Sequence, residues 1–395
     1  MKKIFALSTA FALAMAFTAC SSSDDTTTDS ISTQTSGIIG TQAMVDAACT
    51  EWKESRQDWE WSEAFLFGAA GDYAIDPHTD TWPFDKTMFN NYMAKYNPSS
   101  NADDATILTE AIATGQNLTG FHAVEYLIFR DGEARKVSDI TPDELWFAQT
   151  AAQDLYLASL KLVSAWGGQV TEAEQAMLDD ADFESSKNYG EDFKNAGEKG
   201  SGYSSIVLAT KQIISGAQDI IGEMHDSKIG SPATGADVNY IESPHAYNSI
   251  QDFYDNIMSC KHALYGGWTV TGDPTESSLI GICLRIDRIK DKASAVCEAL
   301  TTALEKISAM KKPFVKYYTD QSAKDAMSAL NDLDDALTYL DAAIDEYGDD
   351  NEILNGYFKT VNENYVDYTV IPTYRALADN NKSLVEALNK LTWKK

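Results

Sequence analysis

The chain has 395 residues, of which 44% are hydrophobic and 11% aromatic, and its formal net charge at pH 7 is −29. This length and apolar content predict a folded globular protein with a substantial core and exclude a disordered chain. The excess of acidic side chains leaves no basic surface to neutralise phosphate, which excludes nucleic acid as a partner and disfavours docking of the protein surface to an anionic membrane.

The first 20 residues have the pattern of a secretion signal. Two lysines are followed by an apolar stretch over residues 4–17, and small residues precede Cys20. The pattern resembles a bacterial lipoprotein signal, so residues 1–20 are expected to be a signal peptide and Cys20 the lipidated first residue of the mature protein. The apolar stretch is too short to span a bilayer permanently, so membrane contact would be through the lipid anchor alone. Residues 21–40 are mostly Ser, Thr, Asp and Gly, which predicts a flexible tether.

From about residue 41 almost to the end, the apolar spacing follows the α-helical period, with no convincing two-residue alternation. This predicts an all-α fold. A stretch rich in glycine and proline at 229–243 predicts a boundary between an N-terminal helical domain over 41–235 and a C-terminal helical domain over 240–395. We expect a duplicated four-helix-bundle arrangement. The expected helices span residues 42–67, 84–96, 103–130, 142–166, 171–182, 203–227, 246–266, 275–310, 321–347, 351–366 and 373–393.

Two helix starts and one connection are well marked. Thr141 is followed by proline and two acids, and Thr171 and Glu174 have the spacing of a capping box. The irregular stretch 68–83 is longer than a connection within a bundle needs, which suggests that it has a functional role.

The cysteines that follow Cys20 are widely spaced and form no Cys-x-x-Cys pair, so neither a zinc motif nor a redox motif is indicated. Cys283 and Cys297 could pair in an oxidising compartment, and the alternative is that all of them are buried free thiols.

The segment from Leu118 to Phe129 contains the most informative pair of residues. It is apolar on nearly every side, and His122 and Glu125 are the exceptions. A helix made from it should be buried, and a buried carboxylate is costly unless a partner or a metal compensates. Because the two residues are three positions apart, their side chains share one helix face and can converge on one point.

The first predicted helix carries a second anomaly, because Arg56 and Glu63 fall on its apolar stripe. Charged groups on a core-facing stripe normally pair with one another or with a group across the core. They therefore either form an internal salt bridge that fixes packing or line the same cavity as His122 and Glu125.

At this point a family resemblance becomes specific. Gly120-Phe121-His122-Ala123-Val124-Glu125 matches the G-x-H-x-x-E motif of the imelysin-like family of bacterial envelope proteins. The blocks at 56–83, 242–256 and 313–314 resemble further family blocks in the same order, so the similarity runs from about residue 42 to the C-terminus. One departure is Pro244-His245, where many members have an Arg-Phe-like pair. The resemblance implies a duplicated helical bundle, an envelope location, an association with iron or other metal uptake, and an older label of metallopeptidase.

The peptidase label can be weighed on the residues themselves. A zinc peptidase needs three protein ligands, an open coordination position and a general base. An inverted zinc motif would need a histidine at position 126, which is Tyr126, and no other two histidines have ligand spacing. Metal binding without hydrolysis requires less, because one imidazole with two or three carboxylates suits iron, manganese or zinc.

The sequence therefore predicts a lipid-anchored outer-membrane protein of a Gram-negative envelope, facing either the periplasm or the cell surface. It would bind a metal ion such as iron, or a metal chelate, and could work with an envelope iron-transport system. The alternatives are a metallopeptidase and a structural or binding module in which the pair only fixes packing. The expected metal ligands are His122, Glu125 and Glu63. Two other expected site residues are Arg56, which would orient a carboxylate through a bidentate pair, and Gly120, which would allow close approach of a neighbouring segment. Asp76 is expected as a further oxygen ligand. Asp252 is also an expected site residue, and it faces either the first domain or solvent.

Overall fold

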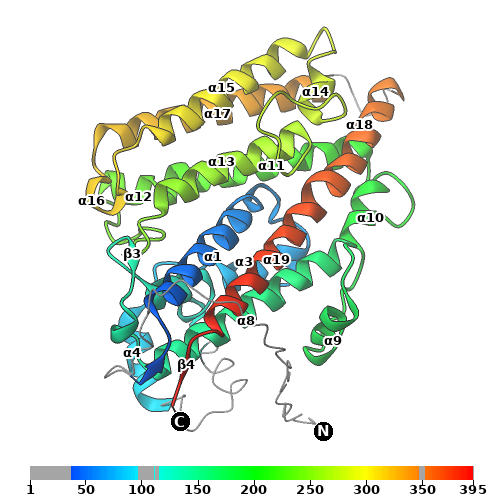
Figure 1. Cartoon of the computed structure of the whole chain (residues 1–395). Coiled ribbons are helices and arrows are strands. Elements are labelled where there is room, and N and C mark those ends of the chain that lie inside the picture. The colour runs from blue at the N-terminus through cyan, green and yellow to red at the C-terminus, as the bar shows by residue number, and fades with distance from the viewer. Residues whose placement is uncertain (1–36, 97–110, 112–114, 347–351, 395) are drawn as a thin grey trace, which may run out of the picture.

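The computed structural model describes residues 37–96, 111, 115–346 and 352–394. They form a helical bundle protein, as the sequence predicts, with two groups of long helices (Figure 1). The first group consists of α1 (Gln42–Glu60), α7 (Gly120–Ile128), α8 (Pro142–Ala165) and α19 (Ile371–Leu388). The second group consists of α11 (Ile206–Glu223), α13 (Ser249–Tyr265), α15 (Lys290–Ser308) and α17 (Gln321–Asp345). Among the described helices, none is long and apolar enough to cross a membrane.

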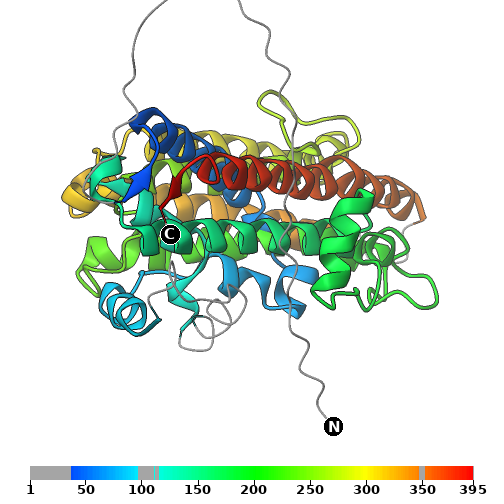
Figure 2. The same ribbon diagram turned by 60° about the horizontal axis from the view of Figure 1, so that its bottom comes forward.

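The first group is built around α19, which packs against both α1 and α8, while α7 packs on α8 and α1. Figure 2 shows α19 and α8 running side by side. Trp52 of α1 is fully buried in this group and meets the Phe129 ring edge-on at a centroid distance of 5.2 Å. Large apolar side chains of this kind supply most of the free energy that holds helices together.

The second group is held by packing of α15 on α17 and of α11 on α13 and α17. The chain returns from it to the first group through α18 (Glu352–Tyr365), a π-helical turn at Val366–Val370 and α19. The helices expected at 351–366 and 373–393 correspond to α18 and α19, and the chain stays helical between them through the π turn. Pro372, at the start of α19, removes one backbone donor, and the wider π turn precedes it.

The division into domains at 229–243 stays a prediction. Helices α1 and α8 precede that stretch and α19 follows it, yet all three share one buried core. A short antiparallel pair of β1 (Ile38–Ile39) and β4 (Thr392–Trp393) also joins the two ends of the described chain.

Three further expected helices are shorter than predicted. The helix expected at 42–67 ends at Glu60, and the helix expected at 275–310 is interrupted between α14 and α15. Of the helix expected at 103–130, residues 103–110 and 112–114 lie outside the described residues. The later part is helical only from Gly120, whose positive φ of 74° starts a new helix. The helix start at Thr141 and the capping box at Thr171 are confirmed, and Thr141 also forms a capping box with Glu144.

The remaining elements are short. They are the 3-10 turns Glu63–Phe65, Gln116–Leu118 and Val137–Asp139, the helices α2 (Ala69–Asp72), α3 (Ile75–Thr79), α4 (Lys86–Tyr96), α9 (Glu172–Asp180), α10 (Tyr189–Lys194), α12 (Gly230–Thr234), α14 (Leu279–Cys283) and α16 (Phe314–Tyr317), the π turn Met224–Lys228, and the hairpin of β2 (Phe129–Arg130) with β3 (Glu133–Ala134).

The four described cysteines are free thiols, so the expected alternative of a Cys283–Cys297 pair is absent from the described structure. The predicted signal peptide, Cys20 and residues 21–36 of the tether lie outside the described residues.

Candidate metal centre

The G-x-H-x-x-E motif lies where the start of α7 meets the end of α3. Gly120 is in the left-handed region, and a Cβ atom there would overlap the carbonyl oxygen of Thr79. Only glycine combines this backbone conformation with such a close approach. The contact brings the segment that carries Asp80 onto the first turn of α7, which carries His122.

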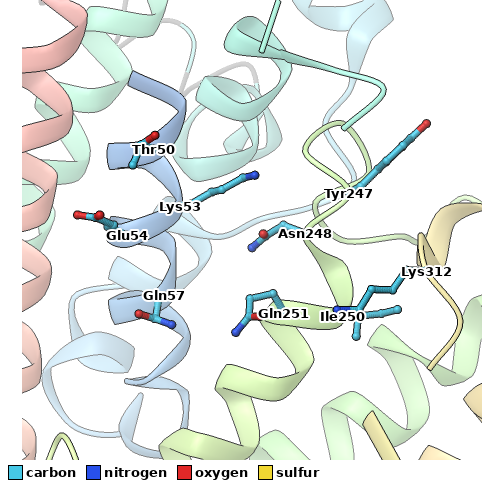
Figure 3. A pocket seen from close by; sticks show the side chains of 9 residues that line it. All are labelled: Thr50, Lys53, Glu54, Gln57, Tyr247, Asn248, Ile250, Gln251 and Lys312. Carbon is cyan, nitrogen blue, oxygen red and sulfur yellow. The ribbon is translucent and has the colours of Figure 1, made fainter. Parts of the chain in front are cut away.

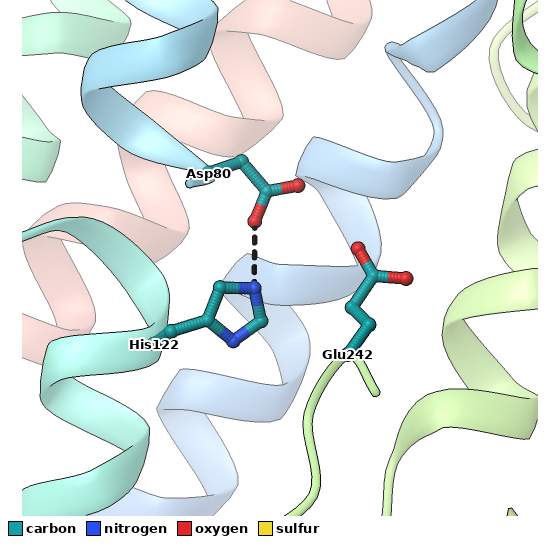
Figure 4. Close-up of side chains that lie close together, drawn as sticks. All are labelled: Asp80, His122 and Glu242. Atoms are coloured by element: carbon teal, nitrogen blue, oxygen red, sulfur yellow. Dashed lines mark ion pairs between the residues drawn. The ribbon is translucent and has the colours of Figure 1, made fainter. Parts of the chain in front are cut away.

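His122 is buried, with 2% of its surface exposed, and it lies between two carboxylates. Its Nδ1 is 3.1 Å from Glu125 Oε2, and its Nε2 is 3.1 Å from Asp80 Oδ1, as Figure 4 shows for Asp80. Burial alone lowers the pKa of an imidazole. The contacts with Asp80 and Glu125 outweigh burial and raise the pKa of His122 to about 9. Without a metal, His122 is therefore an imidazolium at neutral pH.

Both carboxylate oxygens of Glu125 have partners. Its Oε2 pairs with His122, and its Oε1 accepts hydrogen bonds from the backbone N–H groups of His245, at 2.7 Å, and Ala246, at 2.8 Å. Burial would raise the pKa of Glu125, but the contact with His122 and the other nearby donors lower it. Glu125 thus fixes the orientation of the His122 ring.

Arg56 is the centre of a buried ion network. It comes from α1, it is completely buried, and its guanidinium lies within ion-pair distance of four carboxylates from four separate segments. These carboxylates belong to Glu60, Asp80, Glu242 and Asp252. Burial lowers the pKa of Arg56, but these carboxylates outweigh burial and raise it well above its usual value, so Arg56 is a permanent cation.

Lys228 supplies a second buried cation. Its Nζ is 2.9 Å from Glu242 Oε1 and 3.8 Å from Glu60 Oε2, and it lies 4.9 Å from the centroid of the Trp82 ring. The carboxylates outweigh the effect of burial and raise the pKa of Lys228 well above its usual value. A buried lysine stays charged only where acids surround it in this way.

Acids nevertheless outnumber bases in this cluster. The buried basic groups are Arg56, His122 and Lys228, and the buried acids are Glu60, Glu63, Asp80, Glu125, Glu242 and Asp252. Burial raises the pKa values of Glu60 and Glu63 well above the usual range and that of Asp252 to about 7. A surplus of buried carboxylates has to take up protons or a further cation.

Several polar atoms of the cluster have no hydrogen-bond partner in the described structure. They include Oε2 of Glu242, Oδ2 of Asp252 and Oδ1 of Asn256, all buried. Most buried polar atoms in proteins are paired, so a concentration of unpaired acceptors marks a place where a cation or water is expected.

Three sets of side chains bring donor atoms within 4.8 Å of one another, close enough to hold one metal ion. The sets are Asp80–His122–Glu242, Glu60–Glu63–Asp80 and Glu60–Glu242–Asp252. Figure 4 shows Asp80 and His122 facing each other with the Glu242 carboxylate beside them. Of these sets, the first contains an imidazole, and one nitrogen with two oxygens is a donor set that iron, manganese and zinc accept.

The comparisons with known proteins agree with the sequence motif. A family model described as imelysin matches residues 22–353. The chain belongs to the imelysin family. Iron-regulated protein A of Synechococcus elongatus is 28% identical over 230 residues, which cover 58% of this chain and 53% of that protein. The chain thus spans about half the length of this curated relative.

Two crystal structures share the imelysin fold with this chain. One, described as an iron-regulated protein A precursor from Parabacteroides distasonis, has a TM-score of 0.58 and 24% identity, over 77% of this chain and 91% of that chain. The other, an imelysin peptidase from Bacteroides ovatus, has a TM-score of 0.50 and 22% identity, over 60% of this chain and 66% of that chain. At these identities the likeness establishes the fold.

The residues predicted from this imelysin sequence take different places in the cluster. Glu63 is buried, with 6% exposed, in the 3-10 turn after α1, and belongs to the second set of donors. Glu125 belongs to none of the three sets among the described residues. Asp252 is completely buried and faces Arg56, at 3.7 Å. Asp76 is partly buried, and burial together with the nearby Asp80 raises its pKa to about 7.

Sequence reasoning missed Asp80, Glu242, Glu60 and Lys228. Two of them could have been suspected. Asp80 lies in the irregular stretch 68–83, whose length already indicated a role, and Glu242 lies at the end of the break at 229–243. Glu60 and Lys228 carry no local signal, because an acid or a lysine near a helix end is ordinarily exposed.

Proposed function

We propose that this imelysin-family protein binds a metal cation through Asp80, His122 and Glu242, and that it handles iron at the cell envelope. The observation that carries the proposal is the placing of His122. One ring nitrogen is held by Glu125, and the other is buried beside the carboxylates of Asp80, at 3.1 Å, and Glu242. The relatives named iron-regulated protein A support iron as the metal.

The arrangement fits the way proteins prepare a histidine for a metal. A carboxylate that accepts a hydrogen bond from one ring nitrogen selects the tautomer whose other nitrogen has a free lone pair. Glu125 does this for Nδ1 of His122, and the backbone donors of His245 and Ala246 hold Glu125 in turn. A cation at Nε2 would also offset the surplus of buried acid.

Burial favours binding over hydrolysis. Asp80, His122 and Glu242 are 4%, 2% and 0% exposed, and Arg56 contacts both carboxylates. A peptidase needs an open metal position that a peptide bond can reach. The described site offers a cation an enclosed set of donors and gives a peptide no direct access.

The location is part of the proposal and is supported by residues 1–20 alone. A signal peptide followed by a lipidated Cys20 would place the metal centre at the envelope, tethered through residues 21–40. There the protein could receive a metal or a metal chelate and pass it to an envelope iron-transport system.

The proposal is tested by calorimetric titration of chelator-treated protein with Mn²⁺ and Zn²⁺, and with Fe²⁺ in the absence of oxygen. Wild type should bind one cation, and Asp80→Asn, His122→Ala and Glu242→Gln should each weaken binding strongly. Glu125→Gln should weaken binding by about 10- to 100-fold while the fold is kept, because it changes the support of a ligand and not the ligand itself. His225→Gln is the matched control, since His225 pairs with Asp226 outside the cluster.

Equal metal binding by wild type and all four cluster variants would refute the proposal. Cleavage of a mixed peptide library by the wild type, abolished by EDTA and by His122→Ala, would instead establish a peptidase. Circular dichroism of each variant shows whether lost binding reflects lost folding.

A further inference from the structure

A groove separate from the metal centre lies between α1 and the start of α13. Its volume is about 470 Å³, and Figure 3 shows the side chains that line it. None of these side chains belongs to the three sets of metal donors. The volume lies within the range of small-molecule sites in proteins, roughly 300–1,000 Å³.

Two lysines give this groove a positive charge. Lys53 extends into it from α1, and Lys312 approaches from the opposite side (Figure 3). Lys53 lies 5.4 Å from the centroid of the Phe129 ring, and within the described residues neither lysine forms an ion pair with a carboxylate. Glu54 also lines the groove, but its carboxylate turns away from the gap in Figure 3. In a chain with 60 acidic and 31 basic residues, two lysines without acid partners on one groove form a local site for an anion.

Both walls of the groove add amide groups that are held in place, with Gln57 from α1 and with Asn248 and Gln251 from the start of α13. Gln57 and Gln251 each donate to Asp255, at 3.4 Å and 2.9 Å, and Asn248 donates to Asp252 at 2.7 Å. Each amide therefore uses its NH2 group on an acid and keeps its carbonyl oxygen as an acceptor for a ligand hydroxyl. The start of α13 has no side-chain cap, so its first backbone N–H groups can also favour an anion.

We propose that this groove binds a small hydroxylated polycarboxylate anion. The lysines would contact its carboxylates, and the fixed amide oxygens would accept hydrogen bonds from its hydroxyl groups. The proposal goes beyond the metal centre and does not depend on it, because every group that carries it lies on the groove. The ligand could be the free anion or the same anion as a metal chelate, since both present carboxylates to the lysines.

Citrate is the test probe, titrated calorimetrically into chelator-treated protein. One citrate should bind per chain, and the double variant Lys53→Gln, Lys312→Gln should weaken binding about tenfold, since each exposed ion pair contributes only modestly to affinity. Lys311→Gln is the matched control, because Lys311 pairs with Asp320 and does not line the groove. Tricarballylate, which lacks the hydroxyl, should bind more weakly than citrate.

Absence of citrate binding, or equal binding by wild type and the double variant, would overturn the proposal. A second arm repeats the titration with citrate loaded with Ga³⁺. Tighter binding of the loaded form identifies the chelate as the preferred ligand, equal binding identifies the free anion, and both support the groove site. Metal-free citrate should bind equally well to His122→Ala. If His122→Ala lost citrate binding but kept its fold, the proposal of a citrate site in the groove would be contradicted. The proposal that wild type binds a metal would not be affected by that result.

Discussion

The proton on His122 gives the proposed metal centre a measurable pH dependence. In the metal-free protein its pKa is raised to about 9, chiefly because the contacts with Asp80 and Glu125 outweigh burial. At pH 7, two units lower, only about 1% of the imidazole is neutral and able to bind a metal. Metal affinity at pH 7 should therefore be about a hundredfold below its value above pH 9, a difference of about 2.7 kcal/mol.

The assay is competition between the protein and a chelating dye for Mn²⁺ at pH 6, 7 and 8. The buried acids of the cluster also exchange protons on metal binding, so the absolute slope of log Kd against pH is not diagnostic. His122→Gln removes one titrating group and leaves the acids, so its slope should be smaller than that of wild type by about one proton. His225→Gln should keep the wild-type slope. Identical slopes for wild type and His122→Gln would refute the assignment of His122 as a ligand.

Three further predictions concern stability. Arg56→Met leaves buried carboxylates without their main counter-charge and should lower the free energy of unfolding of metal-free protein by about 3–5 kcal/mol in urea denaturation, a loss that added metal partly restores. Gly120→Ala should lower the free energy of unfolding by at least about 2 kcal/mol, because it combines a strained φ with overlap on Thr79. Gly222→Ala, where a Cβ atom would have no neighbour within 4 Å, should leave the free energy of unfolding unchanged or raise it by up to about 1 kcal/mol. The pKa of His122 is raised to about 9 in the native state, whereas the unfolded chain loses this proton near pH 6.5. In thermal melts between pH 6.5 and 9, metal-free protein should therefore lose about 1 kcal/mol of stability per pH unit. Metal-loaded protein and the His122→Gln variant should not show this loss.

The sequence was sufficient for the fold class and for the burial of the His122–Glu125 pair. A long helical period leaves few alternatives to an all-α fold, and an acid and an imidazole in an otherwise apolar helix had to be buried. The structure shows both His122 and Glu125 buried in α7 and in contact with each other.

The partners of that pair could not be predicted, because they come from segments without a periodic pattern. Asp80 follows the short helix α3, and Glu242 lies in the loop before α13, so only the tertiary fold brings them to Nε2 of His122. The role of Glu125 was hidden for a similar reason. Its second oxygen is occupied by backbone N–H groups of His245 and Ala246, and backbone donors leave no mark in a sequence.

Anomalous diffraction from crystals soaked in Zn²⁺ would test the central claim most directly. We predict one strong buried peak about 2.0–2.2 Å from Nε2 of His122 and from carboxylate oxygens of Asp80 and Glu242, with Nδ1 of His122 still bonded to Glu125. Peaks confined to exposed acids, with His122 still paired to Asp80, would contradict it.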